Sequence, residues 1–173
     1  MEKTTKIVIF FIIILVVVVS ITLFLNREDT DERKEMLSSA EVKLLVSGEE
    51  VATLSMEDIQ AAEVEEFEAV YDTSKTEPVM LNYTGVQLKY IMEQQGVDFN
   101  EKETVILSAV DGYTVAYSME EVLMDKNVYL TYAEEGELLK SKEEGGSGPY
   151  QTIVVSDTFS SRRCKWLTTI EVR

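Results

Sequence analysis

The residues best suited to chemistry gather in one short segment near the end of the chain. Residues 160–172, SSRRCKWLTTIEV, contain the only cysteine and the only tryptophan, together with Arg162, Arg163 and Lys165. A cysteine beside cations can ionise at a lowered pKa and act as a nucleophile or a redox thiol. The same cations can instead attract an anionic ligand. This segment therefore bears on whether the protein is an enzyme or a binding module.

The sequence offers Cys164 no partner for catalysis. The chain contains no histidine, and histidine is the commonest general base and transition-metal ligand. If residues 165–172 form a strand, alternation places Cys164 on one face with Trp166, Ile170 and Val172. We therefore predict that Cys164 is a small buried hydrophobe, and we expect no metal site.

The charge of the chain excludes one class of partner. The sequence has 16 Lys and Arg against 32 Asp and Glu, a formal net charge of −16. Because nucleic-acid binding depends on cations that neutralise phosphates, we expect no nucleic-acid partner. Acidic runs such as EVEEFE lack the Asp-x-Asp-x-Asp-Gly spacing of a calcium loop, so they indicate solvated surface.

An apolar run near the N-terminus predicts a membrane anchor. Residues 7–25 contain no charge, and a helix rising about 1.5 Å per residue over this length spans roughly the 30 Å hydrocarbon core of a bilayer. The apolar part of a cleaved signal peptide has only about 7–15 residues and ends at small residues. We expect a short tail over 1–6, a single-pass anchor in the lipid bilayer over 7–25, a polar stalk over 26–40 and a domain over 41–173.

The orientation of this anchor is set by weaker signals. Lys3 and Lys6 precede the run, whereas Arg27, Arg33 and Lys34 follow it, so the count of positive charges does not favour an inside N-terminus. A lone N-terminal span ahead of one domain is the usual signal-anchor arrangement. We therefore expect a cell-membrane protein with its domain on the extracytoplasmic side.

Three capping patterns predict short helices in the domain. In each, Ser or Thr is followed three residues later by an acid or amide. The patterns are Ser55 with Asp58, Thr84 with Gln87, and Ser118 with Glu121. The second opens TGVQLKYIMEQQG, where Gly96 suits the end of a helix.

Strand-like segments outnumber these helices. They lie at 41–47, 67–71, 104–110, 113–118, 128–133, 150–156 and 165–172. Asp111-Gly112 is a hairpin-turn signal between the third and the fourth. Residues 134–149 form a long, polar, glycine-rich connection that is not a phosphate-binding P-loop. Interspersed helices and strands predict an α+β fold with a mixed β-sheet and short helices.

The order of these pieces resembles a known family. The quoted segments, in chain order, are LSMEDIQ, NYTGVQLKYIMEQQGV, SAVDGYTVAYSMEEV, VYLTYAEEGELL, GPYQTIVVS and RRCKWLTTIEV. Together they resemble the molybdopterin-binding domain of the sulfite oxidase family of oxidoreductases, from about Val42 to Val172. The resemblance implies a sulfite oxidase-like fold.

The resemblance also implies where a metal ligand should lie. Family enzymes bind molybdenum through a cysteine in the segment before the Thr-Gly pair, which corresponds to about Val70 to Asp72 here. No cysteine is present there. The missing ligand predicts that this chain has the fold without molybdenum catalysis.

The family's cofactor cleft, mapped onto this chain, implies a candidate rim. It comprises Tyr71, Tyr83, Thr84, Tyr113, Arg162, Arg163 and Lys165. In this hypothesis the Thr84-Gly85 helix start supplies free N–H groups, the cations attract an anion, and Tyr113 stacks or donates a hydrogen bond. The alternative is that Thr84 caps its own helix, the tyrosines pack in the core, and the cations offset acids. Those acids would be Glu134, Glu135, Glu143 and Glu144.

These observations lead to one main expectation and one alternative. The main expectation is a membrane-anchored, extracytoplasmic ligand-binding or interaction domain without a cofactor, whose partner is a small molecule or an envelope protein. The alternative is a small oxidoreductase subunit that binds a molybdopterin-type pterin without a cysteine–metal bond.

Overall fold

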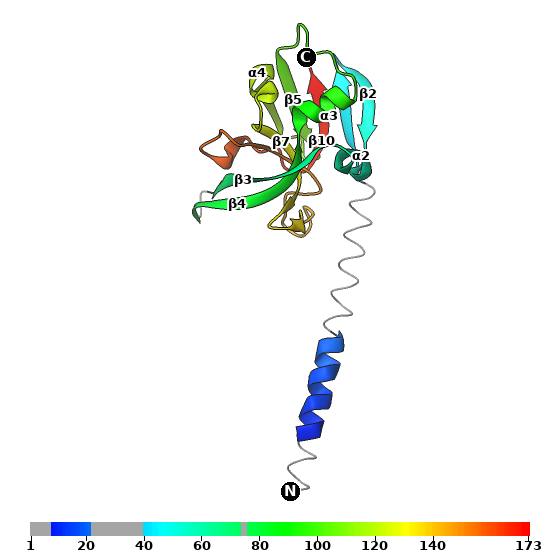
Figure 1. Ribbon diagram of the computed structural model, residues 1–173, viewed down its shortest axis with the longest axis vertical. Coiled ribbons are helices and arrows are strands. Elements are labelled where there is room, and N and C mark those ends of the chain that lie inside the picture. The colour runs from blue at the N-terminus through cyan, green and yellow to red at the C-terminus, as the bar shows by residue number, and fades with distance from the viewer. Residues whose placement is uncertain (1–7, 22–39, 74–75) are drawn as a thin grey trace. The chain divides into compact units, whose positions relative to one another are not determined.

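The chain divides into two compact units, Met1–Leu37 and Ser38–Arg173. The computed structural model describes residues 8–21, 40–73 and 76–173. In the first unit, residues 8–21 form a helix with exposed apolar side chains (Figure 1). No helix within the described ranges has both the length and the apolar character to cross a membrane. The predicted anchor over 7–25 and stalk over 26–40 extend outside the described residues, so both stay predictions.

The second unit contains two five-stranded sheets. The first sheet has the order β2 (Glu49–Leu54), β1 (Val42–Val46), β10 (Leu167–Val172), β5 (Thr104–Ala109) and β6 (Thr114–Ser118). Strands β1 and β10 are parallel, and the remaining pairs are antiparallel. Strand β10, which comes last in the sequence, is therefore the central strand of this sheet and lies beside β1, which comes first.

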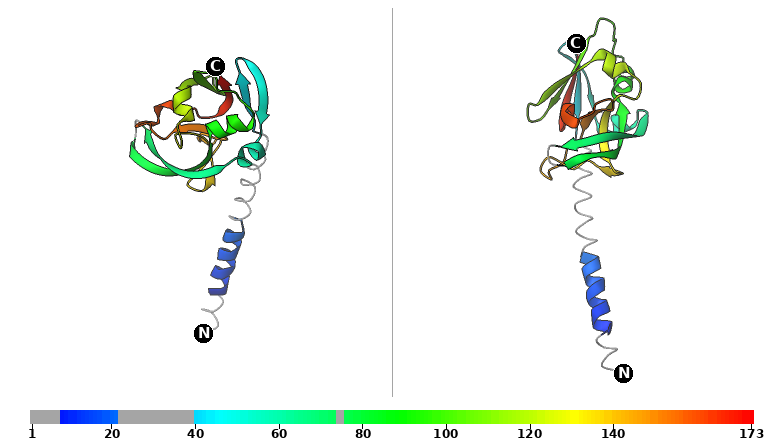
Figure 2. Two further views of the ribbon diagram at one scale, coloured as in Figure 1. Left: turned by 45° about the horizontal axis from the view of Figure 1, so that its top comes forward. Right: turned by 90° about the vertical axis from the view of Figure 1, so that its left-hand side faces the viewer.

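The second sheet is antiparallel and is organised around one buried strand. Its order is β3 (Val64–Thr73), β4 (Thr76–Gln87), β7 (Val128–Glu134) and β8 (Glu137–Leu138), while β9 (Gln151–Val154) also pairs with β7. The long β3–β4 ribbon curves beneath the rest of the unit (Figure 2). Strand β7 is buried along almost its whole length because β4 covers one edge and β8 and β9 cover the other.

Short helices connect the strands, as the sequence predicts. They are α2 (Met56–Gln60), α3 (Leu88–Gln94), α4 (Met119–Leu123) and the 3₁₀ turn η1 (Ser160–Arg162). The capping boxes at Ser55 and Ser118 are both present. The hairpin at Asp111-Gly112 joins β5 to β6, where Gly112 has a φ of 86°. The predicted α+β class is confirmed.

The predicted helix start at Thr84 is wrong. Strand β4 continues to Gln87, and α3 begins at Leu88 without a side-chain cap. Thr84 and Gly85 pair with Ala133 and Thr131 of β7, so their backbone is part of the sheet. A Cβ on Gly85 would lie 2.4 Å from the Leu130 carbonyl oxygen. Tertiary pairing therefore overrides the local capping pattern.

Three other expectations differ in detail. The strands form two sheets, of which only the first is mixed. The nearly continuous apolar run over 104–110 predicts a strand buried on both faces, whereas β5 alternates between buried and half-buried residues, because only one of its faces lies against the core. Strand β10 begins at Leu167, since Trp166 has a φ of 54° and this left-handed residue interrupts the extended chain.

Tyrosines supply much of the core, as the alternative interpretation of these residues predicts. Tyr83, Tyr117, Tyr129 and Tyr150 are at most 1% exposed. Their hydroxyls are hydrogen-bonded: Tyr117 donates to the Arg162 carbonyl at 2.6 Å and Tyr150 donates to a backbone carbonyl at 3.1 Å. Buried phenols with bonded tips fix the packing of several elements at once.

Candidate functional site

Cys164 is buried packing material, as predicted. Its side chain is fully buried, and burial raises the pKa of the thiol to about 12. Its backbone N–H donates to the Thr152 hydroxyl at 3.3 Å, and its carbonyl accepts from the Thr152 N–H at 3.0 Å. A protonated, enclosed thiol is a poor nucleophile and a poor metal ligand.

The Arg163 side chain is buried and forms hydrogen bonds inside the domain. It is 7% exposed, and its guanidinium donates to the Tyr83 hydroxyl at 2.8 Å and to the Val70 carbonyl at 2.6 Å. It also lies over the rings of Tyr71 and Tyr83, at 5.6 and 4.9 Å from their centroids. Burial raises the pKa of Tyr83 to about 12, although the neighbouring guanidinium opposes this shift. Arg163 and Tyr83, both predicted as rim residues, are bonded to each other in the interior, and neither is among the residues that line the pocket described below.

Arg162 is also committed within the protein. Its guanidinium binds Asp157 through two contacts and donates to Glu121 at 2.8 Å. These two acids hold the pKa of Arg162 above its ordinary value, with Asp157 the larger cause. This ion-pair network links η1 to α4. The cation therefore does offset local acids, although they are different acids from those expected.

Tyr113 and Thr84 do not join a common site with these cations. Tyr113 lies in the β5–β6 turn, is 42% exposed, and donates through its hydroxyl to the Ser161 carbonyl at 3.2 Å. Thr84 lies within β4, so it presents no helix N-terminus to a ligand. The predicted rim is thus dispersed among separate structural roles.

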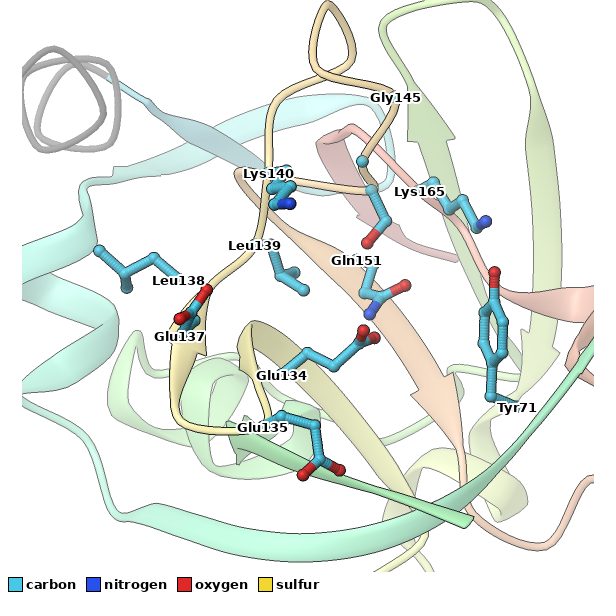
Figure 3. Close-up of a pocket in the computed structure, with 12 residues that line it drawn as sticks. Tyr71, Glu134, Glu135, Glu137, Leu138, Leu139, Lys140, Gly145, Gln151 and Lys165 are labelled. Carbon is cyan, nitrogen blue, oxygen red and sulfur yellow. The ribbon is translucent and has the colours of Figure 1, made fainter. Parts of the chain in front are cut away.

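Two members of the predicted rim, Tyr71 and Lys165, do meet at a pocket. The pocket has a volume of about 440 Å³ and lies between the end of β3, the β7–β8 turn and the glycine-rich loop (Figure 3). The Lys165 ammonium group lies 5.9 Å from the centroid of the Tyr71 ring. The remaining lining residues are Glu134, Glu135, Glu137, Leu138, Leu139, Lys140, Gly145, Gly146, Ser147 and Gln151.

The sequence did not single out Gln151, which is the most informative residue of this pocket. It is 1% exposed, and its side-chain Nε2 has no hydrogen-bond partner among the residues that the structure describes. It forms an isolated antiparallel bridge with Lys165, so the two side chains are neighbours across that bridge. No local pattern marks a glutamine as a site residue, because its lack of a partner arises from the fold.

The pocket also has an acidic wall. Glu134 ends β7, Glu135 lies in the following turn and Glu137 begins β8, and all three line the pocket. Glu135 accepts a hydrogen bond from the Asn82 N–H at 2.8 Å, and the half-buried Glu134 acts electrostatically on the Tyr83 phenol. No cluster of three or more acidic or thiol groups within the described ranges is arranged to hold a metal ion. The wall can instead accept hydrogen bonds from a ligand.

Two five-stranded sheets joined by short helices, with a pocket beside the glycine-rich loop, define an α+β domain. The chain belongs to the oxidoreductase molybdopterin binding domain family, whose model matches residues 31–173. This match confirms the resemblance predicted from the sequence. No curated protein matches the chain.

A solved structure shares the fold. The chain is similar to the sulfane dehydrogenase SoxCD from Paracoccus pantotrophus, with 16% sequence identity and a TM-score of 0.64. The match covers 79% of this chain and 38% of that chain. At this identity the likeness shows the fold alone.

The residues that line the pocket supply no thiolate ligand for a molybdenum–pterin cofactor. At the position expected for the ligand, the Val70 carbonyl is bonded to Arg163 and Tyr71 forms a wall of the pocket. The only thiol of the chain is the buried Cys164, which does not line the pocket. Glu134, Glu135 and Glu137, which also line the pocket, would repel an anionic cofactor.

Proposed function

We propose that this domain is a ligand-binding module of the molybdopterin-binding family that forms no molybdenum–thiolate bond. The observation that carries the proposal is the wall at Val70–Asp72, where Tyr71 and a carbonyl bonded to Arg163 stand in place of a thiolate. Cys164 does not compensate, because its pKa is raised to about 12. The retained pocket is of a size that suits a small molecule, since such sites measure roughly 300–1,000 Å³.

The proposal includes a location. Residues 7–25 would anchor the chain in the cell membrane and hold the domain on the extracytoplasmic side, within reach of small molecules or envelope proteins there. Its support is the length of the uncharged run in the sequence and the exposure of the apolar side chains over 8–21.

A second candidate function follows from family membership. Because the family is described as binding molybdopterin, the chain could be a small oxidoreductase subunit that holds a pterin without a cysteine–metal bond. Lys165, which faces the pocket, is the residue that favours it. The acidic wall disfavours it, since an anionic pterin would meet Glu134 and Glu137.

Metal and pterin analysis of the full-length protein decides between these candidates. The protein is purified in detergent from a host supplied with molybdenum, beside a family enzyme that retains its cysteine as a positive control. We expect molybdenum and pterin fluorescence near background in this protein and stoichiometric values in the control. Stoichiometric pterin without molybdenum would establish the second candidate, and stoichiometric molybdenum would overturn the first.

A further inference from the structure

Gln151 presents a buried donor to the pocket. Its side-chain Nε2 has no partner among the described residues, although the residue is 1% exposed. Buried polar groups in native proteins are nearly always hydrogen-bonded, so an unpaired donor on a pocket wall indicates a missing acceptor. Figure 3 shows the Gln151 side chain pointing into the pocket.

Lys165 adds a positive charge beside this donor. The β-bridge between Gln151 and Lys165 makes their side chains neighbours, and both line the pocket. The Lys165 ammonium lies 5.9 Å from the Tyr71 ring centroid, and no ion pair of Lys165 occurs among the described residues. An amide N–H beside an ammonium group is suited to a carboxylate, because both donate and the ammonium is charged.

Glutamates give the same pocket the complementary charge. Glu134, at the end of β7, is half-buried and points into the pocket (Figure 3), and Glu137, at the start of β8, also lines it. These carboxylates accept hydrogen bonds from an ammonium group and repel a second carboxylate. A purely anionic or purely cationic ligand would therefore leave one sign of charge in the pocket uncompensated.

Resting on the proposed binding function, we infer that the pocket binds a small zwitterion, a free amino acid or dipeptide. Its carboxylate would bind Gln151 and Lys165, and its ammonium group would bind Glu134. An apolar side chain of the ligand would contact the Tyr71 ring, which lines the same pocket beside Lys165. Fixed groups of opposite charge in one pocket orient such a ligand in one direction.

Three probes of matched shape test the inference. Isothermal titration calorimetry on the full-length protein in detergent compares leucine with 4-methylpentanoate, which lacks the ammonium group, and 3-methylbutylamine, which lacks the carboxylate. We expect leucine to bind. Each analogue should have an affinity at least about tenfold lower than that of leucine, because each loses a charge-assisted hydrogen bond. Equal binding of either analogue, or no binding of leucine and glycylleucine, would overturn the inference.

Two variants assign the contacts. Lys165→Met and Gln151→Met should each weaken leucine binding about tenfold, whereas Lys43→Met, on an exposed pair with Glu50, should leave it unchanged. Urea unfolding midpoints establish that each variant is folded before it is titrated. Unchanged affinity in both folded pocket variants would contradict the assigned contacts.

The same preparation separates the two levels of the proposal. Stoichiometric molybdenum in the purified protein would overturn the proposed function and this inference together. Molybdenum at background with no zwitterion binding would overturn this inference alone.

Discussion

Arg163 holds a positive charge inside the domain, where its partners are a phenol and a peptide carbonyl. Its guanidinium donates to the Tyr83 hydroxyl and the Val70 carbonyl at 2.8 and 2.6 Å. Loss of the guanidinium would remove the donor to the buried Tyr83 hydroxyl and one of two donors to the Val70 carbonyl, which also accepts from the Ser160 hydroxyl at 2.9 Å. Such losses are more costly than the net contribution of a hydrogen bond, because the desolvation penalty remains.

We therefore expect Arg163→Met to lower the free energy of unfolding by about 3 kcal/mol. Arg163→Lys should recover only part of this loss, since an ammonium group lacks the fork that reaches both acceptors. Arg173→Met is the control, because Arg173 pairs with Glu171 on the surface and its removal should have little effect. Urea denaturation monitored by Trp166 fluorescence measures all three. Equal midpoints for Arg163→Met and Arg173→Met would contradict a structural role for Arg163.

Cys164 makes stability depend on pH in a defined direction. Burial raises the pKa of its thiol from 9.0 to about 12, so the folded state retains a proton that the unfolded state releases. The stabilising effect is complete below pH 9 and is lost as pH rises from about 9 to about 12. Cys164→Ala should cost on the order of 1 kcal/mol or less at neutral pH, and Cys164→Ser more, through an unsatisfied hydroxyl.

The measurement is the urea midpoint of wild type and Cys164→Ala from pH 8 to pH 11. The wild-type midpoint should fall more steeply, while contributions from tyrosines are common to both proteins. Parallel slopes, or rapid labelling of the native thiol at neutral pH, would show that Cys164 is not enclosed.

At the scale of elements, two of three identical-looking capping patterns form helices and the third does not. Ser118 accepts a hydrogen bond from the Glu121 N–H at 3.1 Å, and Ser55 makes the equivalent bond to Asp58. Thr84 is paired with Ala133 in the sheet instead. The difference is caused by β7, which is distant in sequence. It pairs with β4 as far as Gln87, so the chain stays extended there and α3 begins only at Leu88.

Matched substitutions distinguish a cap from a strand residue. Ser118→Ala should cost about 1 kcal/mol of stability because it removes a helix cap. Thr84→Val should cost much less, because valine retains the strand preference of a β-branched residue. Thermal or urea unfolding of both variants provides the comparison. A loss of stability at Thr84→Val as large as that at Ser118→Ala would restore the capping interpretation.

The sequence predicts elements of this fold better than it predicts the site. Alternation and turn signals locate β5, β6 and β7 closely, because these depend on neighbouring residues. The cations at 162, 163 and 165 look equivalent in sequence, yet only Lys165 faces the pocket. Arg163 turns into the core and Arg162 binds Asp157 and Glu121, so partners far along the chain decide each role. Gln151 carries no sequence signal at all.

At the scale of the whole molecule, the net negative charge repels most anionic partners. The chain has a formal net charge of −16, which favours solubility and opposes close contact with anionic lipid. Five basic side chains among the described residues form ion pairs with acids, namely those of Lys43, Lys89, Lys142, Arg162 and Arg173. The pocket, with lysines facing glutamates, is therefore a site of mixed charge on a strongly acidic surface.

The same negative charge bears on how the chain is held at a membrane. A domain that repels anionic headgroups would not remain at a bilayer by surface adsorption, so retention there requires an inserted segment. We expect the full-length chain to stay in the membrane fraction after an alkaline carbonate wash and to be released by detergent. Replacing Val16 and Val17 with lysine should release it, because each charge at the centre of a span costs about 3 kcal/mol. The control Glu2→Lys, outside the apolar run, should remain with the membrane.

Protease added to intact spheroplasts should digest the domain if it is extracytoplasmic. Release of the wild-type chain by carbonate would contradict the anchor, and protection from protease would contradict the orientation alone.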